Sequence, residues 1–368
     1  MSFFLALLVM VKKERVLHDY ILLTWLIFNG LQLVFFYYNF TKTAGETLPL
    51  EIIGALLPYL LGPLLFIYVN VLVKPGIKLW VHSFHFIPFL YQVVSMLYYF
   101  YLNDGVYGIL VNRGFIQHQG PAPFNICYYG LILAFFSCLY PLISLYLLFR
   151  HRRNIQNEFS YIEKINLDWL RNWIIISITG FFISFTIIWV AQYDWVDYLT
   201  SFQTVAIMVT VNVIIIGFYG LRQSTIFSNV PAQVMAPDSE PKEEKYKSST
   251  LRQPESEELA QKLRSYMEEE KPYLSSQLNI ETLAAKLGMT RHDLSQVINE
   301  QFGVNFFNFI NQYRVDEVKR RITDEKNGHL TLLGIAMETG FNSKSSFNQI
   351  FKKFEGVTPS EYKRRYQG

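Results

Sequence analysis

The sequence predicts an all-α chain in which a polytopic transmembrane helical domain is followed by a cytoplasmic domain with two helix-turn-helix units. Three observations support this prediction. Apolar runs of roughly 20 residues recur up to Gly220, and each is long enough to cross a hydrocarbon layer about 30 Å thick. Such runs stop at Arg222. Towards the C-terminus, a pattern of two short helices then occurs twice.

Six apolar segments have the length of a membrane span. They cover Tyr20–Phe40, Leu48–Val73, Trp80–Leu102, Phe124–Phe149, Trp169–Tyr193 and Tyr198–Leu221. A shorter segment, Ser2–Val11, precedes them and reaches only about 15 Å as a helix, so both six and seven crossings remain open. In the loop of residues 103–123, glycines and prolines are expected to break any regular element.

The Lys and Arg residues of the connecting loops predict the orientation of the spans, because cytoplasmic loops are enriched in these residues. One alternating set of loops contains Lys12, Lys13, Arg15, Lys74, Lys78, Arg150, Arg152, Arg153 and Lys164. The other set contains only Lys42 and Arg113. The richer set is therefore expected in the cytoplasm, together with everything that follows Arg222.

The chain divides into four parts by composition. We expect a membrane domain over residues 1–222, a flexible linker over 223–254, a connecting helix over 255–270 and a DNA-binding domain over 271–368. The linker is polar and contains several prolines, a composition that cannot bury a core. In the connecting helix, Leu259, Leu263 and Met267 form one apolar stripe. Its partner is the DNA-binding domain, another subunit or both.

Ionisable residues in apolar segments are candidates for a functional role, because burying charge in lipid is costly. They are Glu51, His82, His85, Asp194 and Asp197. Most lie near segment ends, where water and headgroups reduce that cost. The spacing of His82 and His85 suits a metal ion on a helix, but no third ligand is apparent, so interfacial histidines are the favoured interpretation.

The sequence contains no motif for catalysis. A P-loop, a kinase ATP motif, a nucleophile elbow and paired carboxylates are all absent from the cytoplasmic part. Cys127 and Cys138 would lie about 16 Å apart along one helix, too far to form a disulfide. We therefore expect no enzyme activity, no cofactor and no metal site.

The internal repeat is the strongest signal in the chain. Residues pair at a constant separation: Thr290 with Ser343, Leu294 with Phe347, Gln296 with Gln349, and Gly303 with Gly356. Each copy contains a short apolar helix, a glycine suited to positive φ (Gly288 or Gly340), a capping hydroxyl and a second helix. This order of features is typical of a helix-turn-helix unit.

Cap chemistry also predicts where the neighbouring helices begin. Thr290 with Asp293, and Thr358 with Glu361, match capping boxes. Between the two copies, Asn305–Ile322 is expected to form one helix about 27 Å long. A helix of this length holds two recognition helices roughly one DNA turn apart, near the 34 Å that separates successive major grooves.

The stretch Leu278–Tyr366 resembles the DNA-binding domain of the AraC/XylS transcription regulators. The similarity is carried by Gly340–Phe347, Phe351–Phe354 and Gly356–Tyr362. This resemblance covers about a quarter of the chain and implies sequence-specific promoter binding. The soluble effector domain of many relatives is absent, so their effectors do not carry over.

A weaker resemblance to membrane-bound bacterial members of that family comes from Leu61–Phe66 and His85–Phe89. It implies a location in the bacterial cytoplasmic membrane. The expected partners are double-stranded promoter DNA, the lipid bilayer, RNA polymerase and a second copy of the chain.

The exposed faces of the two recognition helices are expected to contact bases. The residues predicted to bind DNA are Arg291, His292, Ser295, Gln296, Lys344, Ser345, Asn348 and Gln349. Glutamine can bond adenine and lysine can reach guanine, whereas Arg291 and basic residues outside this set would contact phosphate or solvent. That second group comprises Arg291, Arg314, Lys319, Arg320, Lys352, Lys353, Lys363, Arg364 and Arg365.

Three functions remain compatible with this pattern. In the first, the membrane half senses a signal and the C-terminal domain regulates transcription. In the second, the membrane half only anchors the regulator, although one span would suffice for that. In the third, a transporter-like membrane protein carries a DNA-binding tail. We further expect residues 254–368 to fold as an independent fragment, because no apolar face in it needs a membrane partner.

Overall fold

The computed structural model describes residues 1–13, 15–41, 54, 56–74, 76–102, 109–112, 115–118, 129–163, 165–191, 198–228, 253–327 and 329–367. The fold is all-α, as predicted, apart from one short hairpin. The chain forms two compact units. Unit 1 contains residues 1–149 and 167–238, and unit 2 contains residues 150–166 and 239–368.

Unit 1 is a helical bundle in which α2 (Leu17–Thr41) contacts several other helices. Its neighbours are α1 (Ser2–Val11), α4 (Pro58–Val73) and α9 (Tyr198–Ser228). α9 also packs along α8 (Asp168–Ala191). The short helix α1 belongs to this core, because its Leu5, Ala6 and Val9 are buried against the bundle.

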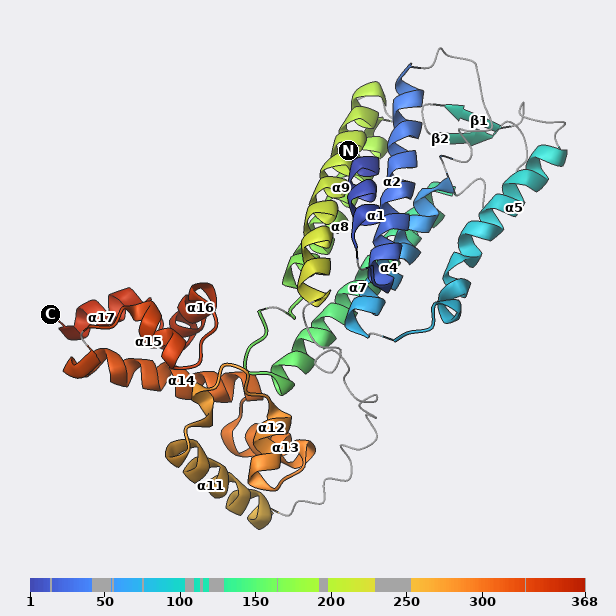
Figure 1. The fold of residues 1–368 in the computed structure, drawn as a ribbon. Coiled ribbons are helices and arrows are strands. Elements are labelled where there is room, and N and C mark those ends of the chain that lie inside the picture. Colours follow the sequence, from blue (N-terminus) through green and yellow to red (C-terminus); the bar gives the residue numbers. More distant parts are fainter. Residues whose placement is uncertain are drawn as a thin grey trace. The chain divides into compact units, whose positions relative to one another are not determined.

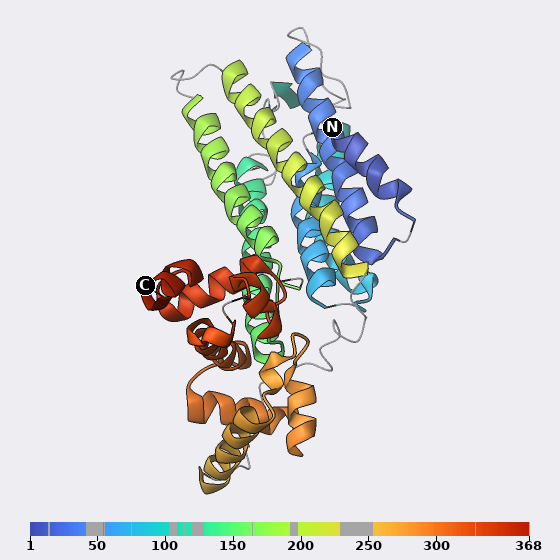
Figure 2. The same cartoon turned by 60° about the vertical axis from the view of Figure 1, so that its left-hand side comes forward.

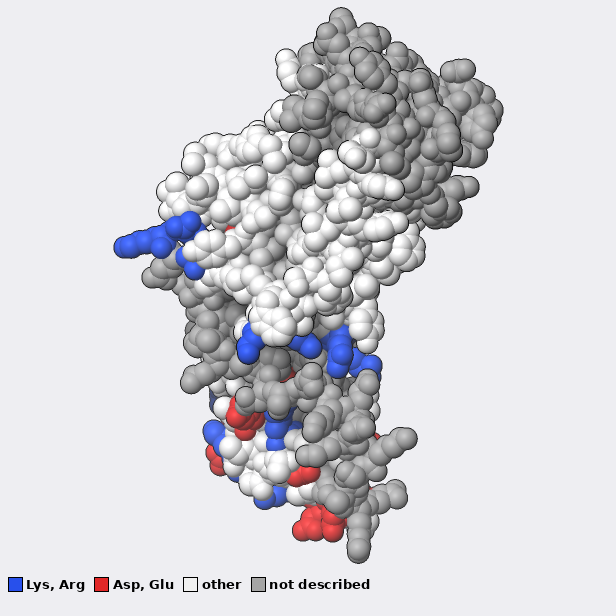
Figure 3. Space-filling model, turned by 90° about the vertical axis from the view of Figure 1, so that its right-hand side faces the viewer, with Lys and Arg blue, Asp and Glu red and all other residues white. Residues whose placement is uncertain are grey.

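Four helical stretches among the described residues have the length and composition needed to cross a membrane. They are Leu17–Tyr38, Gly130–Glu158, Asp168–Ile187 and Gln203–Leu221. Their outer faces expose large apolar side chains, such as Phe135, Tyr146, Ile176 and Phe182. In Figure 3, most described atoms of this unit belong to uncharged residues. So many exposed large apolar side chains are unusual for a soluble protein.

Two expectations for this unit were wrong. Trp80–Leu102 is not one continuous α-helix: residues Leu79–Phe86 form the 3₁₀-helix η1, and α5 follows over Ile87–Leu102. The loop of residues 103–123 contains an antiparallel hairpin of β1 (Ile109–Asn112) and β2 (Phe115–His118). The paired residues Ile109–Asn112 and Phe115–His118 include no glycine or proline, so the breakers counted in this loop lie outside the strands themselves.

Several predicted features of this half lie outside the described residues. They are Glu51, Cys127, Asp194, Asp197 and linker residues 229–252. Both histidines are described. His82 is buried with its Nε2 3.3 Å from the Asn70 amide nitrogen, and His85 Nδ1 lies 3.4 Å from the Tyr140 hydroxyl. Across the described ranges, no three His, Cys, Asp or Glu side chains come together as a metal site.

Unit 2 contains the repeated helix pairs. The first pair is α12 (Ile280–Leu287) with α13 (Arg291–Phe302), and the second is α15 (Leu332–Glu338) with α16 (Lys344–Glu355). The long helix α14 (Phe306–Thr323) lies between the two pairs (Figures 1 and 2). Helix α17 (Pro359–Gln367) follows the second pair and packs on α14 and α16.

The connecting helix α11 (Gln253–Glu269) packs against α13. Its Leu263 and Met267 are fully buried in the core of the first pair, and Lys262 donates a hydrogen bond to the Leu287 carbonyl at 2.7 Å. The apolar stripe of this helix is therefore covered by the same chain. Of the partners left open by the sequence, the structure shows contacts with the DNA-binding domain.

The last turns of α7 (Tyr129–Glu158) and the residues after it also belong to unit 2. Ile155, Ile162 and Ile165 are buried in the core of the second helix pair, beside residues such as Val318 and Phe351. Residues 254–368 were expected to leave no apolar face that needs a membrane partner, but residues 150–166, placed by the sequence in the membrane domain, cover one such face. A segment more than 100 positions earlier therefore completes this core.

Candidate nucleic-acid interface

Side-chain caps define where both recognition helices begin. The Thr290 hydroxyl accepts a hydrogen bond from the Asp293 N–H at 3.1 Å at the start of α13. The Ser343 hydroxyl does the same for the Ser346 N–H at 3.0 Å at the start of α16. These bonds satisfy amide groups that a helix end leaves unpaired. Both predicted caps are confirmed.

Turn geometry agrees with the prediction as well. Gly288 and Gly340 follow the first helix of each pair with φ of +68° and +93°. Thr358 and Glu361 form the predicted capping box at α17, with the Thr358 N–H donating to the Glu361 carboxylate at 2.8 Å. In the predicted box at α13, the Asp293 carboxylate instead accepts the Thr290 hydroxyl proton at 2.7 Å.

Each recognition helix buries one face and exposes the other. Leu294, Val297 and Ile298 of α13 are buried, as are Phe347, Ile350 and Phe351 of α16. Polar candidates occupy the remaining positions because buried residues recur with helical periodicity. The sequence pattern therefore identified the core face and the outer face of both helices.

The candidates on α16 are all exposed: Lys344, Ser345, Asn348 and Gln349. Those on α13 are more constrained. Arg291 and His292 are exposed, whereas Ser295 and Gln296 are half-buried, and the Gln296 amide donates to the Glu300 carboxylate at 2.9 Å. Arg291 is paired with Glu158, with 3.3 Å between guanidinium nitrogen and carboxylate oxygen. Thus the candidates on α16 are all exposed, whereas on α13 Ser295 and Gln296 are half-buried and both Arg291 and Gln296 contact glutamates of the same unit.

Arg314 was predicted to contact phosphate or solvent, and this prediction was wrong. Its side chain is only 1% exposed, at the middle of α14. The guanidinium donates to the backbone carbonyls of Tyr273, Ser275 and Ser160, at 2.8, 2.9 and 3.2 Å. Burial lowers the pKa of Arg314 to about 10. A buried guanidinium needs several acceptors to offset its desolvation, and here it ties loops together.

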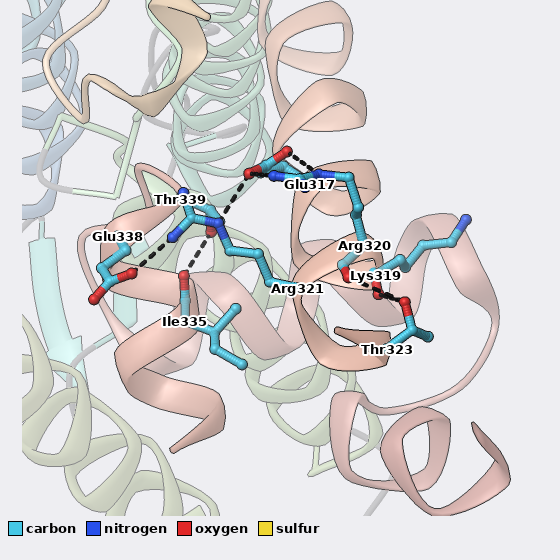
Figure 4. A network of polar contacts seen from close by, with 8 residues as sticks. All are labelled: Glu317, Lys319, Arg320, Arg321, Thr323, Ile335, Glu338 and Thr339. Atoms are coloured by element: carbon cyan, nitrogen blue, oxygen red, sulfur yellow. Dashed lines mark hydrogen bonds and ion pairs between the residues drawn. The ribbon is translucent and has the colours of Figure 1, made fainter. Parts of the chain in front are cut away.

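Other basic residues of α14 form ion pairs within unit 2. The Glu317 carboxylate accepts bonds from Arg320 and Arg321, and Arg321 also reaches Glu338 of α15 at 2.7 Å (Figure 4). Burial alone would raise the pKa of Glu317, but both guanidinium groups outweigh it and lower the pKa to about 2. Lys319 pairs with Glu355 of α16 at 3.0 Å. These contacts fix α14 against the second helix pair.

The remaining basic candidates lie around α16 and α17. Lys352, Lys353, Arg364 and Arg365 are exposed and Lys363 is half-buried. Lys353 donates a hydrogen bond to the Asn308 side chain at 2.8 Å. Positive side chains beside a recognition helix are suited to contact phosphate oxygens on either side of a groove.

Sequence reasoning missed the residues of the 150–166 segment that reach this surface. Besides Glu158, the Glu163 carboxylate accepts a hydrogen bond from the Ser343 hydroxyl at 2.5 Å. One available signal was the concentration of apolar residues, Ile155, Phe159, Ile162 and Ile165, in a short stretch that is otherwise rich in charged and polar residues. Several apolar residues gathered in such a stretch indicate a buried contact.

Comparison with known proteins assigns the C-terminal region. A family profile described as a helix-turn-helix domain matches residues 283–365. An uncharacterized HTH-type transcriptional regulator of Staphylococcus aureus (strain COL) is 34% identical over 88 residues, which are 23% of this chain and 11% of that protein. The uncharacterized HTH-type transcriptional regulator YtdP of Bacillus subtilis (strain 168) is 24% identical over 90 residues, with 24% and 11% covered.

This chain therefore spans only about a tenth of the length of these curated relatives. Among solved structures, a protein of unknown function from Listeria innocua is similar at 27% identity with a TM-score of 0.26. The match covers 29% of this chain and 96% of that one. The C-terminal region thus carries a helix-turn-helix domain of the kind present in transcriptional regulators.

Proposed function

We propose that this chain is a membrane-embedded transcription regulator that binds promoter DNA with α13 and α16. The observation that carries the proposal is the pair of capped helices with buried apolar faces and exposed polar faces, within the region matched to helix-turn-helix domains. α14, with 18 residues, is about 27 Å long and separates the two pairs. That spacing suits two adjacent major-groove segments on one face of B-DNA.

In this proposal, α16 supplies most of the base contacts. Gln349 and Asn348 offer amides that can bond adenine through two atoms, and Lys344 can reach guanine O6 or N7. The α13 candidates Arg291, His292, Ser295 and Gln296 contribute from the neighbouring groove. The exposed basic residues after Phe351 bind phosphates and add affinity without sequence preference. RNA polymerase and a second copy of the chain are proposed partners on the promoter.

The proposal places unit 1 in the bacterial cytoplasmic membrane with the C-terminal domain in the cytoplasm. Its support is the four long apolar helices with exposed apolar faces and the distribution of basic residues between loops. A single span would be enough to anchor a regulator. We therefore include the sensing of a signal by the helical bundle in the proposed function.

DNA binding is tested with the full-length protein in detergent. A preferred duplex is first selected from a random library, and affinity for it is compared with affinity for a scrambled duplex. Gln349→Ala or Lys344→Ala should cost about 1–3 kcal/mol on the selected duplex only. Lys353→Ala should weaken both duplexes alike, because phosphate contacts do not depend on sequence.

Two results would contradict parts of this proposal. A library from which no sequence is enriched would exclude specific DNA binding. An equal loss on both duplexes for Gln349→Ala would assign that residue to phosphate. The location is tested separately with a reporter active only in the cytoplasm, fused after Arg222. An inactive fusion of normal abundance would overturn the proposed orientation.

A further inference from the structure

Residues 150–166, termed the strap, pack on the helix-turn-helix domain. The strap comprises the last turns of α7 and the residues that lead on to α8, and it groups with unit 2. Its isoleucines at 155, 162 and 165 are buried beside Val315, Val318 and Phe351. The strap is therefore held by a core contact, and not only by surface charges.

A polar anchor lies at the middle of the strap. Ser160 is 1% exposed, and its hydroxyl donates to the Leu278 carbonyl at 2.6 Å. The same hydroxyl accepts from Arg314 at 3.0 Å, and the Ser160 carbonyl accepts from Arg314 and from the Asn311 amide. Buried groups that satisfy one another in this way define a specific docked position.

Backbone pairing extends the anchor to the first helix pair. Phe159 forms an antiparallel bridge with Asn279, the residue that caps α12. The Ser160 N–H donates to the Leu278 carbonyl at 3.3 Å, so the bridge is of the type in which the two facing residues do not bond each other. In such pairs the Cα atoms are about 4.5 Å apart.

The two glutamates of the strap contact the first turns of the two recognition helices. Glu158 pairs with Arg291, the first residue of α13. Glu163 accepts the hydroxyl proton of Ser343, the cap of α16. Helix N-termini attract anions through their unpaired N–H groups and dipole, and DNA phosphates commonly occupy such positions. Glu158 and Glu163 occupy the Arg291 guanidinium and the Ser343 hydroxyl, two donors that a phosphate could otherwise use, and their negative charge repels the DNA backbone.

We propose that the docked strap inhibits DNA binding by this chain, and that release of the strap frees the first turns of α13 and α16. The inference rests on the proposed function of these helices. Because the strap is continuous with α7 and α8, a change at the ends of these helices is transmitted to it through the chain. The docked and the released states would then bind DNA with different affinities. A signal can act only by shifting the balance between states that differ in this way.

The proposal is tested by locking the strap with a disulfide. Phe159→Cys and Asn279→Cys are introduced into full-length protein that carries Cys127→Ala and Cys138→Ala. The Cα separation of about 4.5 Å expected for this pair lies within the range that a disulfide spans. Oxidised protein should bind the selected duplex at least about fivefold more weakly than the same sample after reduction, the lower end of usual coupling between sites.

The reduced sample is the control for the loss of the Phe159 side chain and the Asn279 cap, because both samples carry the same substitutions. If neither sample prefers the selected duplex to a scrambled one, while the cysteine-free protein does, a second pair of variants decides. If the cysteine-free protein shows no preference either, the proposed function itself fails. Equal affinity of oxidised and reduced samples for the selected duplex, or tighter binding when oxidised, overturns the strap proposal alone.

The second pair of variants changes charge without cysteines. Glu158→Gln with Glu163→Gln should tighten binding by about threefold, since exposed charge contacts are individually weak. Glu257→Gln with Glu258→Gln, on the exposed face of α11, makes the same change in net charge as a matched control. Equal tightening by both double variants would assign the effect to net charge and overturn the proposal.

Discussion

Gly340, in the turn of the second helix pair, lies close to Tyr273 and Leu274, which precede the first pair. A Cβ atom added at Gly340 would lie 2.5 Å from the Tyr273 carbonyl oxygen and 2.8 Å from Arg314 Nε. Gly288 occupies the equivalent turn of the first pair with φ of +68°, but a Cβ there would meet nothing within 4 Å. Substituting each glycine by alanine therefore distinguishes the free-energy cost of a left-handed backbone conformation from the additional cost of steric crowding.

We predict that Gly288→Ala destabilises unit 2 by about 1 kcal/mol, through the left-handed conformation alone. Gly340→Ala adds a clash with backbone atoms and should cost at least about 2 kcal/mol more than Gly288→Ala. Hydrogen exchange of the α14 amides in the full-length protein measures both effects. Equal protection from exchange in the two variants would show that the backbone at Tyr273 shifts to accept the added methyl group at little cost.

Arg314 shows why the sequence alone misplaced some residues. Its charge alone placed it among the phosphate-binding or solvated residues, although it lies four positions after Ile310 and four before Val318, which are both buried. Its acceptors are carbonyls 39, 41 and 154 positions away, and nothing in the local sequence marks them. The candidates on α16 were placed correctly on the outer face because helical periodicity is a local property.

At the scale of elements, cap chemistry predicted helix starts well. The predicted caps Thr290, Ser343 and Thr358 each bond an amide in the first turn of the following helix. Asn305, which the sequence placed inside the next helix, caps α14 in the same way. Hydropathy was a poorer guide in unit 1. It does not distinguish a 3₁₀-helix from an α-helix, so the change at Ile87 between η1 and α5 was missed.

Ser343 links an element to the strap, and this predicts a coupling. Ser343→Ala should cost about 1 kcal/mol for the lost cap, and Thr290→Ala should cost a similar amount at α13. Of these two caps, Ser343 is the one that also bonds Glu163. In a double-mutant cycle with Glu163→Gln, the effect of Ser343→Ala on the free energy of unfolding should therefore show a coupling of at least about 0.5 kcal/mol. In the matching cycle, the effects of Thr290→Ala and Glu163→Gln should be additive.

Urea unfolding of unit 2 in the full-length protein, followed by circular dichroism, supplies the free energies for both cycles. The cycle through Thr290 is the control, because it removes the same kind of cap from the other recognition helix. A coupling of equal size in the two cycles would mean that Glu163 acts through the whole domain and not through its bond to Ser343.

At the scale of the whole molecule, each compact unit is built from two stretches that are separate along the chain. The repeat, α14 and α11 were predictable because each is a continuous segment with its own periodicity or cap. The strap was not, because its burial depends on contacts across more than 100 residues. This arrangement makes the connection between two apolar helices a structural part of the DNA-binding unit.

A fragment of residues 254–368 should consequently be less stable than unit 2 within the full chain. Without the strap, it exposes the apolar surface that Ile155, Ile162 and Ile165 cover, and Arg314 loses both acceptors of Ser160. Adding a synthetic peptide of residues 150–166 should raise the melting temperature of the fragment. At a peptide concentration of 100 times Kd, the expected stabilisation is about 2.7 kcal/mol.

A peptide with Ser in place of the three isoleucines is the matched control, because it keeps the charges of Glu158 and Glu163 but cannot fill the core. It should leave the melting temperature unchanged, since exposed ion pairs contribute little without the apolar contact. The native peptide should also weaken binding of the fragment to the selected duplex, as the strap would in the full chain. If both peptides stabilise the fragment equally, charge rather than core packing holds the segment. If neither does, docking requires the covalent connection to α7 and α8.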